Sequence, residues 1–293
     1  MNKVLGNKKY IAIFVLPAFV FYLIFVLFPI GYNVYLSFFR TNLMGNSAFI
    51  GITNYINLYN DQFFVMAFKN NIFLMIGSLL AHLPLALFFA NALFQKIKGS
   101  KFFQYVFFLP TVICGVAVGM MFNFVYNSEF GIVNKILDII NLGNLKMAWL
   151  NDEKTVMYAL IFVIMWRFVG YHMVIQLAAM KSIPESLYES ASLEGATNWQ
   201  QFRGITFPLI RHILKIDAIL IITGSIKYYD LVAVMTKGGP NHASEVMSTY
   251  MFYQGFRTMK FGYASAIGII LLVLCLLVIW GVNYFAKTED YEY

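Results

Sequence analysis

Charged residues are scarce in this chain of 293 residues, and their scarcity argues against a water-soluble domain. Only 12% of the residues are charged, whereas 60% are hydrophobic. A soluble domain could not cover that much apolar side chain with so few charges. The net charge of +7 does not indicate nucleic-acid binding, because the basic residues are spread along the loops and form no dense patch interleaved with aromatic residues.

Cysteine and the patterns of metal and catalytic sites are equally sparse. The two cysteines, Cys114 and Cys275, lie far apart inside apolar stretches, which argues against a disulfide framework. The histidines and acidic residues lack metal-ligand spacing, so no metal site is predicted. The sequence contains no nucleophile–base–acid arrangement and no GxxxxGKS/T phosphate loop. We therefore expect neither an enzyme nor a chain that binds ATP through such a loop.

Long apolar stretches, by contrast, are abundant and predict an all-α polytopic membrane protein. Several of them have about 20 mostly apolar residues, enough to cross a ~30 Å hydrocarbon core as a helix. The first could pass for a signal peptide, but it has no cleavage site and is interpreted as a retained span. We predict six transmembrane helices in a single membrane domain that covers residues 1–293, at residues 11–36, 72–94, 103–125, 156–180, 206–226 and 262–286.

The basic residues predict an orientation for these spans. Six crossings put both termini on the same side of the membrane. That side receives dense basic residues close to the span ends, namely Lys3, Lys8, Lys9, Lys96, Lys98, Lys101, Lys181, Arg203, Arg211, Lys215 and Lys287. Basic residues on the other side are spread over longer loops. The positive-inside rule therefore assigns both termini, and the loop that follows the fourth span, to the cytoplasmic side of the membrane.

Two loops carry signals of short helices. On the outer side, Ile132, Ile136, Ile139 and Ile140 have helical spacing and are typical of an amphipathic interfacial helix, with simple loop packing as an equal alternative. The cytoplasmic loop is predicted to be helix, glycine turn, helix. Its signals are two capping boxes and a glycine suited to end a helix, at Ser182 with Glu185, at Thr197 with Gln200, and at Gly195.

The cytoplasmic loop at 181–207 also matches a longer spacing, E-x-A-x-x-x-G-x9-I-x-x-P. The matching residues are Glu189, Ala191, Gly195, Ile205 and Pro208. This spacing resembles the E-A-A loop of ABC-importer permeases, which docks the permease onto its ATPase. Two positions depart from the motif, because Ser190 replaces its first alanine and Phe207 replaces the usual leucine before the proline.

Other segments extend the resemblance over nearly the whole chain, to the carbohydrate-importing permeases of the maltose/oligosaccharide type. One is the F-x-G-x-x-N-Y pattern at 49–55, and another is the Gly-Gly-Pro loop, LVAVMTKGGP, at 231–240. Further matches are FFLP at 107–110, GIVN at 131–134 and FGYASA at 261–266. The E-A-A loop alone indicates an importer permease, and the Gly-Gly-Pro loop narrows the resemblance to the sugar branch.

The resemblance implies an ABC type I importer permease fold and a division of labour. A second homologous permease subunit would complete the pore, and two ATPase subunits would hold ATP and magnesium. An extracellular solute-binding protein would deliver the sugar, and this chain would bind no cofactor itself. The ATPase-coupling residues implied are those of the motif, Glu189, Ala191, Gly195, Ile205 and Pro208.

The resemblance also implies a substrate path on the helices before and after the cytoplasmic loop. Its residues in this chain are Ile164, Arg167, Phe168, Tyr171, Thr223, Lys227 and Tyr228. Arg167 stands out independently, because a charge inside an apolar span costs about 2.5–3.5 kcal/mol on insertion scales. It would line a wet cavity or pair with a carboxylate such as Asp217 or Asp230.

The expected function is thus that of the membrane subunit of an ATP-driven sugar importer. Importers of other polar solutes, such as glycerol phosphate, belong to the same class. A membrane enzyme would need acidic catalytic residues at the membrane face, whereas the few acids here cluster in the cytoplasmic loop and the C-terminal tail. A secondary transporter working alone would need no ATPase-docking loop.

Overall fold

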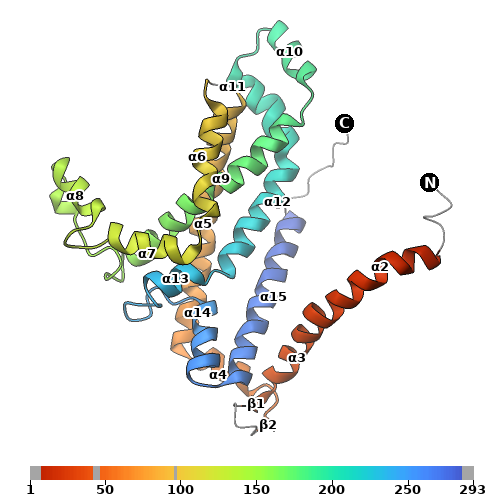
Figure 1. The fold of residues 1–293 in the computed structure, drawn as a ribbon, viewed down its shortest axis with the longest axis vertical. Helices are drawn as coiled ribbons and strands as arrows, with labels where there is room; N and C mark the ends of the chain where they lie inside the picture. The colour runs from red at the N-terminus through yellow and green to blue at the C-terminus, as the bar shows by residue number, and fades with distance from the viewer. Residues whose placement is uncertain (1–7, 42–46, 96–97, 286–293) are drawn as a thin grey trace. The chain divides into compact units, whose positions relative to one another are not determined.

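The computed structural model describes residues 8–41, 47–95 and 98–285, which form helices and one short hairpin (Figure 1). The C-terminal tail and three basic residues of the predicted orientation, Lys3, Lys96 and Lys287, lie outside the described residues. The chain divides into two units. The first comprises residues 1–61 and 251–272, and the second comprises 62–250 and 273–293.

The first unit begins with a long apolar helix. Helices α2 (Lys8–Tyr22) and α3 (Phe28–Ser37) are joined without a break by a π-helical turn, Leu23–Leu27. Pro29 lies in the first turn of α3, where a missing backbone N–H is tolerated best. The side chains from residue 13 to residue 35 are exposed in the isolated chain. A helix so apolar and so little covered by its own chain is typical of a membrane span.

A hairpin and helix α4 (Thr53–Asn60) follow α3. Strands β1 (Phe39–Thr41) and β2 (Ser47–Phe49) pair antiparallel, with Phe39 opposite Phe49. The Asn54 amide donates to the carbonyls of Ser37 at 2.7 Å and Phe39 at 3.0 Å. Asn54 belongs to the F-x-G-x-x-N-Y pattern, and its side chain ties α4 to the turn that leaves the first span.

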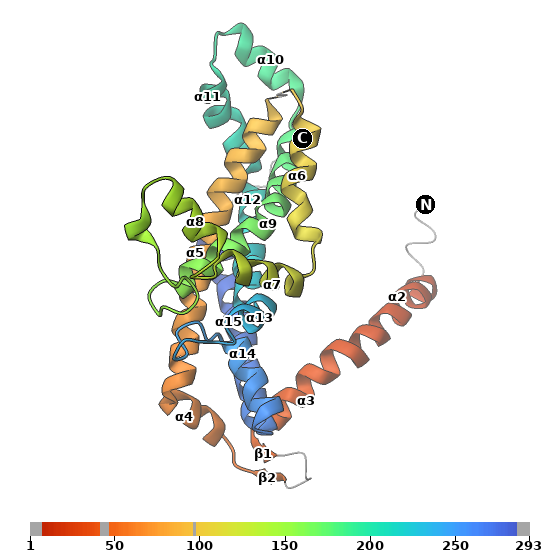
Figure 2. The ribbon, with the colours of Figure 1, turned by 60° about the vertical axis from the view of Figure 1, so that its left-hand side comes forward.

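The second unit is built around helix α9 (Val156–Lys181). It packs against α5 (Gln62–Phe94), α6 (Ser100–Val112) and α12 (Phe207–Ile226), which run alongside it in both views (Figures 1 and 2). Because α9 is covered on several sides, it is apolar around nearly its whole circumference. Buried residues from α5, α7 (Gly115–Val125), α9 and α13 (Asp230–Met235) form one core cluster. Buried residues from α5, α9 and α12 form another.

The predicted third span, 103–125, consists of two helices rather than one. Helix α6 ends at Val112, α7 (Gly115–Val125) begins three residues later, and the two are bent by 98°. Ile113 and Cys114 between them are extended. Pro110 in the last turn of α6 cannot donate a backbone hydrogen bond, which weakens the helix just before the break.

Helix length and composition agree with four of the predicted spans, at Ile13–Ser37, Gln62–Phe94, Val156–Lys181 and Phe261–Phe285. The second begins ten residues earlier than the predicted 72–94, and the bent pair α6–α7 would make a fifth span. Helix α12 differs, because it carries Arg211, Lys215 and Asp217. The count of six crossings therefore stays a prediction.

Short elements complete the chain. Helix α8 (Ile132–Ile139) forms where the isoleucine spacing predicts it, with Ile132, Ile136 and Ile139 exposed. Its location at a membrane interface stays a prediction. Further elements are, in chain order, a 3₁₀ turn at Gly143–Leu145, helix α13 (Asp230–Met235), helix α14 (Met247–Phe252), a π-helical turn at Tyr253–Arg257 and the last helix, α15 (Phe261–Phe285).

Asn71 joins three helices and gives a test of this arrangement. Its fully buried amide on α5 donates to the carbonyl of Ile226 at 2.9 Å and accepts from the Met247 N–H at 2.7 Å. The substitution Asn71→Leu leaves both backbone groups unpaired, which should cost about 1–3 kcal/mol. We expect a lower thermal unfolding midpoint in detergent.

Asn60→Leu is the matched control, because the exposed Asn60 amide donates only to Ile56, one turn earlier in its own helix. Equal midpoints for the two variants would contradict the assigned role of Asn71.

Candidate functional site

The predicted cytoplasmic loop contains two short helices, α10 (Glu185–Leu193) and α11 (Asn198–Gln201). The capping box predicted at Ser182 and Glu185 is wrong. The Ser182 hydroxyl donates to the carbonyl of Ala179 at 2.8 Å, and Pro184 occupies the N-cap of α10 without a side-chain cap. Ser182 follows α9 directly, so its hydroxyl bonds back to the last turn of that helix rather than forward.

Gly195 ends α10, as the sequence predicts. Its φ of +80° is left-handed, a conformation that costs glycine little. The Ala196 N–H donates to the Ala191 carbonyl at 2.9 Å, and the Gly195 N–H donates to the Ser192 carbonyl at 3.1 Å. These two bonds are those of a Schellman motif, which satisfies carbonyls at a helix end.

Thr197 begins the second helix, and its predicted capping box with Gln200 is confirmed. The backbone N–H of Gln200 donates to the Thr197 hydroxyl at 3.4 Å, and the backbone N–H of Thr197 donates to the side-chain Oε1 of Gln200 at 2.7 Å. From there α11, a π-helical turn at Phe202–Thr206 and α12 follow one another without a break. The second half of the loop is thus the first part of a continuous helical rod.

The motif residues lie on different faces of this segment. Glu189 and Gly195 are exposed, as is Pro208 at the start of α12, whereas Ala191 and Ile205 are half-buried. Two large apolar side chains beside them have little cover from the described residues, because Leu193 is 91% exposed and Trp199 is 66% exposed. The segment therefore presents both polar and apolar surface.

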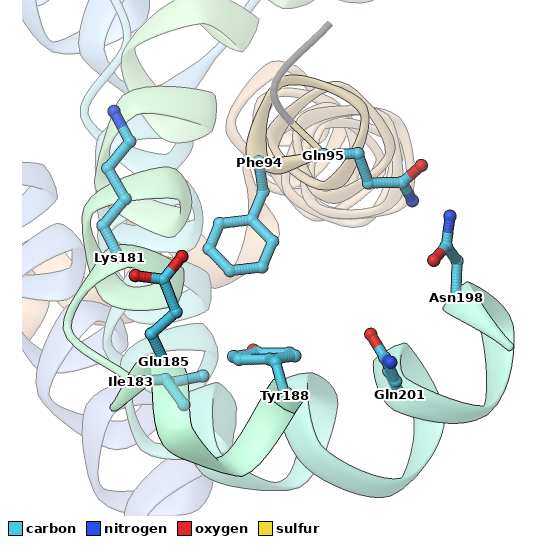
Figure 3. A pocket seen from close by; sticks show the side chains of 8 residues that line it. All are labelled: Phe94, Gln95, Lys181, Ile183, Glu185, Tyr188, Asn198 and Gln201. Atoms are coloured by element: carbon cyan, nitrogen blue, oxygen red, sulfur yellow. The ribbon is translucent and has the colours of Figure 1, made fainter. Parts of the chain in front are cut away.

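A cavity of about 370 Å³ lies behind this surface. In Figure 3 the rings of Phe94 and Tyr188 face its middle, and the amides of Gln95, Asn198 and Gln201 gather along one side. The two ring centroids are 5.4 Å apart. The Tyr188 hydroxyl lies 2.9 Å from the Thr206 hydroxyl, and burial raises the pKa of the Tyr188 phenol. Tyr188 thus holds α10 against α5 and the rod.

A second cavity, of about 350 Å³, lies between α5, α9 and α12. Four of the residues predicted for the substrate path line it, Ile164, Phe168, Tyr171 and Tyr228. Aromatic rings therefore form much of its wall, and the edge of Phe168 meets Tyr228 at a centroid distance of 6.2 Å.

Arg167 has a carboxylate partner, which is one of the two roles the sequence left open. Its Nη1 donates to Asp230 Oδ2 at 3.1 Å and to the Tyr228 hydroxyl at 3.3 Å, and its Nη2 donates to the Ile113 carbonyl at 3.2 Å. The guanidinium also lies 4.9 Å from the centre of the Phe168 ring. Arg167 thus holds two cavity-lining rings and the α6–α7 break in place, and does not itself line the cavity.

The other two predicted path residues lie apart from the cavity. The Thr223 hydroxyl donates to Ile219 in its own helix at 2.7 Å, and Lys227 is an exposed residue at the end of α12. The cavity instead has lining residues that the sequence reasoning missed, His82, His172, Leu220, Ile221, Gly224 and Ser225. Counting back from Tyr228 in steps of four would have found Gly224 and Leu220.

Comparison with known proteins identifies the family of this chain. Residues 82–289 match the family described as binding-protein-dependent transport system inner membrane component. The chain belongs to this family. It is therefore the membrane component of a transport system, not an enzyme, and this permease has the type I fold.

Individual relatives agree with that assignment. The permease is 38% identical to the probable ABC transporter permease protein YurN of Bacillus subtilis, over 92% of this chain and 93% of YurN. It is 33% identical to the osmoprotective compounds uptake permease protein GgtC of Synechocystis, over 89% of this chain and 93% of GgtC. It is 29% identical to the multiple sugar-binding transport system permease protein MsmF of Streptococcus mutans, over 94% of this chain and 93% of MsmF.

The fold matches a solved structure as well. The permease superposes with a TM-score of 0.83 on a chain of a bacterial ABC transporter involved in the import of the acidic polysaccharide alginate. The match covers 97% of each chain at 25% identity. Because it spans nearly all of both chains, it includes the segment 181–207 and the cavity-lining helices.

Gly115 gives a test of the Arg167–Asp230 pair. A Cβ at this position would lie 1.7 Å from Asp230 Oδ2 and 2.7 Å from Arg167 Nη1. Gly115→Ala should therefore push the carboxylate away and lower stability by about 1–3 kcal/mol, the usual cost of overpacking. We expect a lower thermal midpoint for the purified permease.

A double-mutant cycle checks the cause, because Asp230→Ala removes the atom that the new methyl group meets. In that background Gly115→Ala should cost much less. Gly281→Ala, which has open space around it, serves as the control. Additive effects of the two substitutions would contradict the proposed clash.

Proposed function

We propose that this permease is the transmembrane subunit of an ATP-driven importer for a sugar, with an oligosaccharide as the expected substrate, delivered by an extracellular solute-binding protein. The observation that carries the proposal is the cavity between α5, α9 and α12. A sugar offers C–H faces that stack on aromatic rings and hydroxyls that need hydrogen bonds. Phe168, Tyr171 and Tyr228 supply the rings, and Ser225 and His172 supply polar atoms.

The relatives support the same class of substrate. MsmF is a permease of a multiple sugar-binding transport system, and the solved structure comes from an importer of a polysaccharide. GgtC takes up osmoprotective compounds, so a small osmoprotective solute is the second candidate. Uptake assays with labelled oligosaccharides and with small osmoprotectants separate the two.

An anionic substrate such as glycerol phosphate fits the cavity less well. Among the described residues, the basic groups predicted for the path are Arg167 and Lys227. The Arg167 guanidinium is occupied by Asp230, the Tyr228 hydroxyl and the Ile113 carbonyl. Lys227 is exposed and does not line the cavity. A neutral solute therefore matches the charge of the site better.

The partners proposed are a second homologous permease subunit and two ATPase subunits, which would hold ATP and magnesium. The cytoplasmic segment, 181–207, would dock on an ATPase through the motif residues. Its exposed Leu193 and Trp199 support this, because large apolar side chains so exposed are typical of a surface that a partner covers. The same orientation would place both termini in the cytoplasm. Lys98, Lys101 and Lys181 support it, because they lie at helix ends on the same side as this segment.

The first test is capture of the tagged chain from its native membranes in mild detergent, with mass spectrometry of the proteins recovered. A second permease and an ATPase are expected. In Gly195→Val we expect several-fold less ATPase, because a β-branched residue is strained at positive φ and would redirect the helix end.

Gly204→Val is the matched control in the same segment, since Gly204 has open space around it and an ordinary φ. Recovery of neither partner with the wild-type chain would favour a transporter that works alone. Its uptake would survive ATP depletion and fail when the ion gradient is collapsed.

Tyr171 tests the substrate path directly. It is 38% exposed and lines the cavity. Tyr171→Ala removes a ring worth about 0.5–1.5 kcal/mol against a sugar face, by analogy with aromatic pairs. We expect a roughly threefold to tenfold higher KM for uptake in proteoliposomes, with assembly intact.

Tyr158→Ala is the control on the same helix, because Tyr158 is 63% exposed and lies outside the cavity. Unchanged uptake kinetics in Tyr171→Ala would remove Tyr171 from the path.

A further inference from the structure

A buried polar cluster lies against the same cavity and has no assigned role. Asp217 on α12 is 0% exposed, and each of its carboxylate oxygens has a partner on α9. The His172 Nδ1 lies 2.7 Å from Oδ1, and the Gln176 amide donates to Oδ2 at 2.7 Å. An ionisable group inside an apolar helix bundle is costly, so its presence indicates a function.

A tie between α9 and α12 would explain Asp217 and Gln176, but it leaves His172 only half explained. His172 lines the cavity beside Tyr171, whose ring it meets edge-on at 5.2 Å. Asp217 uses only one of the two ring nitrogens. The His172 Nε2 has no hydrogen bond among the described residues. It is not among the polar atoms that are both fully buried and unpaired, so it keeps some exposed surface.

The Asp217 contact also sets the tautomer of a neutral His172 ring. The 2.7 Å distance fits an N–H donor facing a carboxylate oxygen, so in the neutral ring we assign the proton to Nδ1. Nε2 is then an acceptor. His82 on α5 also lines the cavity and meets the His172 ring at 5.3 Å, but its two nitrogens face the Ser78 carbonyl at 2.7 Å and the Ile164 carbonyl at 3.3 Å. His172 is therefore the histidine available to a ligand.

We propose that His172 is a substrate-binding residue whose Nε2 accepts a hydrogen bond from one hydroxyl of the transported sugar. Asp217 is its positioning residue, which sets the ring orientation and the tautomer, and Gln176 in turn holds Asp217. This inference rests on the proposed function, since it requires a solute that carries hydroxyl groups. It adds specificity for a hydroxyl donor to the aromatic stacking described above.

His172→Asn separates ligand binding from the helix tie. The shorter amide can occupy the position of Nδ1 and donate to Asp217, but it lacks the distal nitrogen. In proteoliposomes that contain the assembled importer, maltotriose, lactose and chitobiose are the probes for uptake. For the probe that is transported, we expect a roughly tenfold higher KM in His172→Asn with kcat little changed, the loss of one hydrogen bond.

His212→Asn is the matched control, because His212 lies on α12 outside the cavity. Failure of the wild-type importer to transport any of the probes would count against the proposed function. Transport by the wild type with an unchanged KM in His172→Asn would overturn only the role of His172.

Asp217→Asn tests the tautomer and does not depend on the first variant folding. An amide at this position can donate to Nδ1, which moves the imidazole proton to Nε2 and makes it a donor. Monodeoxyfluoro derivatives of the transported sugar read out this change, because fluorine accepts weakly and cannot donate. At one ring position the wild type should discriminate roughly tenfold against fluorine, and Asp217→Asn should lose most of that discrimination. An equal preference in both proteins, at every position, would overturn the proposal.

Discussion

Lipid offers no hydrogen bonds, so a polar side chain inside a membrane helix bundle must pair within its own helix, pair with another helix or line a wet cavity. Asn71 meets backbone groups at the end of α12 and the start of α14, Arg167 meets Asp230, and His172 meets Asp217. In lipid, apolar packing distinguishes poorly between one apolar face and another, so these contacts decide which face of each helix points inward. Among the described residues, Ser78 Oγ, Arg167 Nε and Gln176 Oε1 are exceptions, buried without a hydrogen-bond partner.

The cavity between α5, α9 and α12 follows from two of these contacts. Arg167 and His172 are five residues apart on α9, and each is drawn toward a carboxylate of a different helix. Between them lie Phe168 and Tyr171, whose rings contribute to the cavity wall. A wall of aromatic rings and aliphatic side chains, in which the His172 Nε2 is unpaired among the described residues, suits a solute that carries many hydroxyls and no charge.

The sequence predicted features that depend on local chemistry. Gly195 and the Thr197–Gln200 box are settled within a few residues. The role of Arg167 depends on residues far along the chain, so the sequence left it open between lining a wet cavity and pairing with Asp217 or Asp230. The break at Ile113 and Cys114 was missed, because it depends on Arg167, more than fifty residues away, which binds the Ile113 carbonyl that the break leaves free. The capping box at Ser182 was mispredicted because α9 ends immediately before it. The cavity wall was found only in part, because α12 turns Gly224 and Ser225 inward and Thr223 and Lys227 away.

The unbroken helical rod that begins at Asn198 and ends at Ile226 has a mechanical consequence. Its residues rise by about 1.5 Å each, so the rod is roughly 40 Å long. The π-helical turn at Phe202–Thr206, which contains Gly204, is the place where such a rod bends most readily. Beyond that turn, α12 is a continuous helix that would move as one piece. Trp199 lies near one end, and the cavity-lining Gly224 and Ser225 lie near the other. A tilt of α12 would therefore change the shape of the cavity wall.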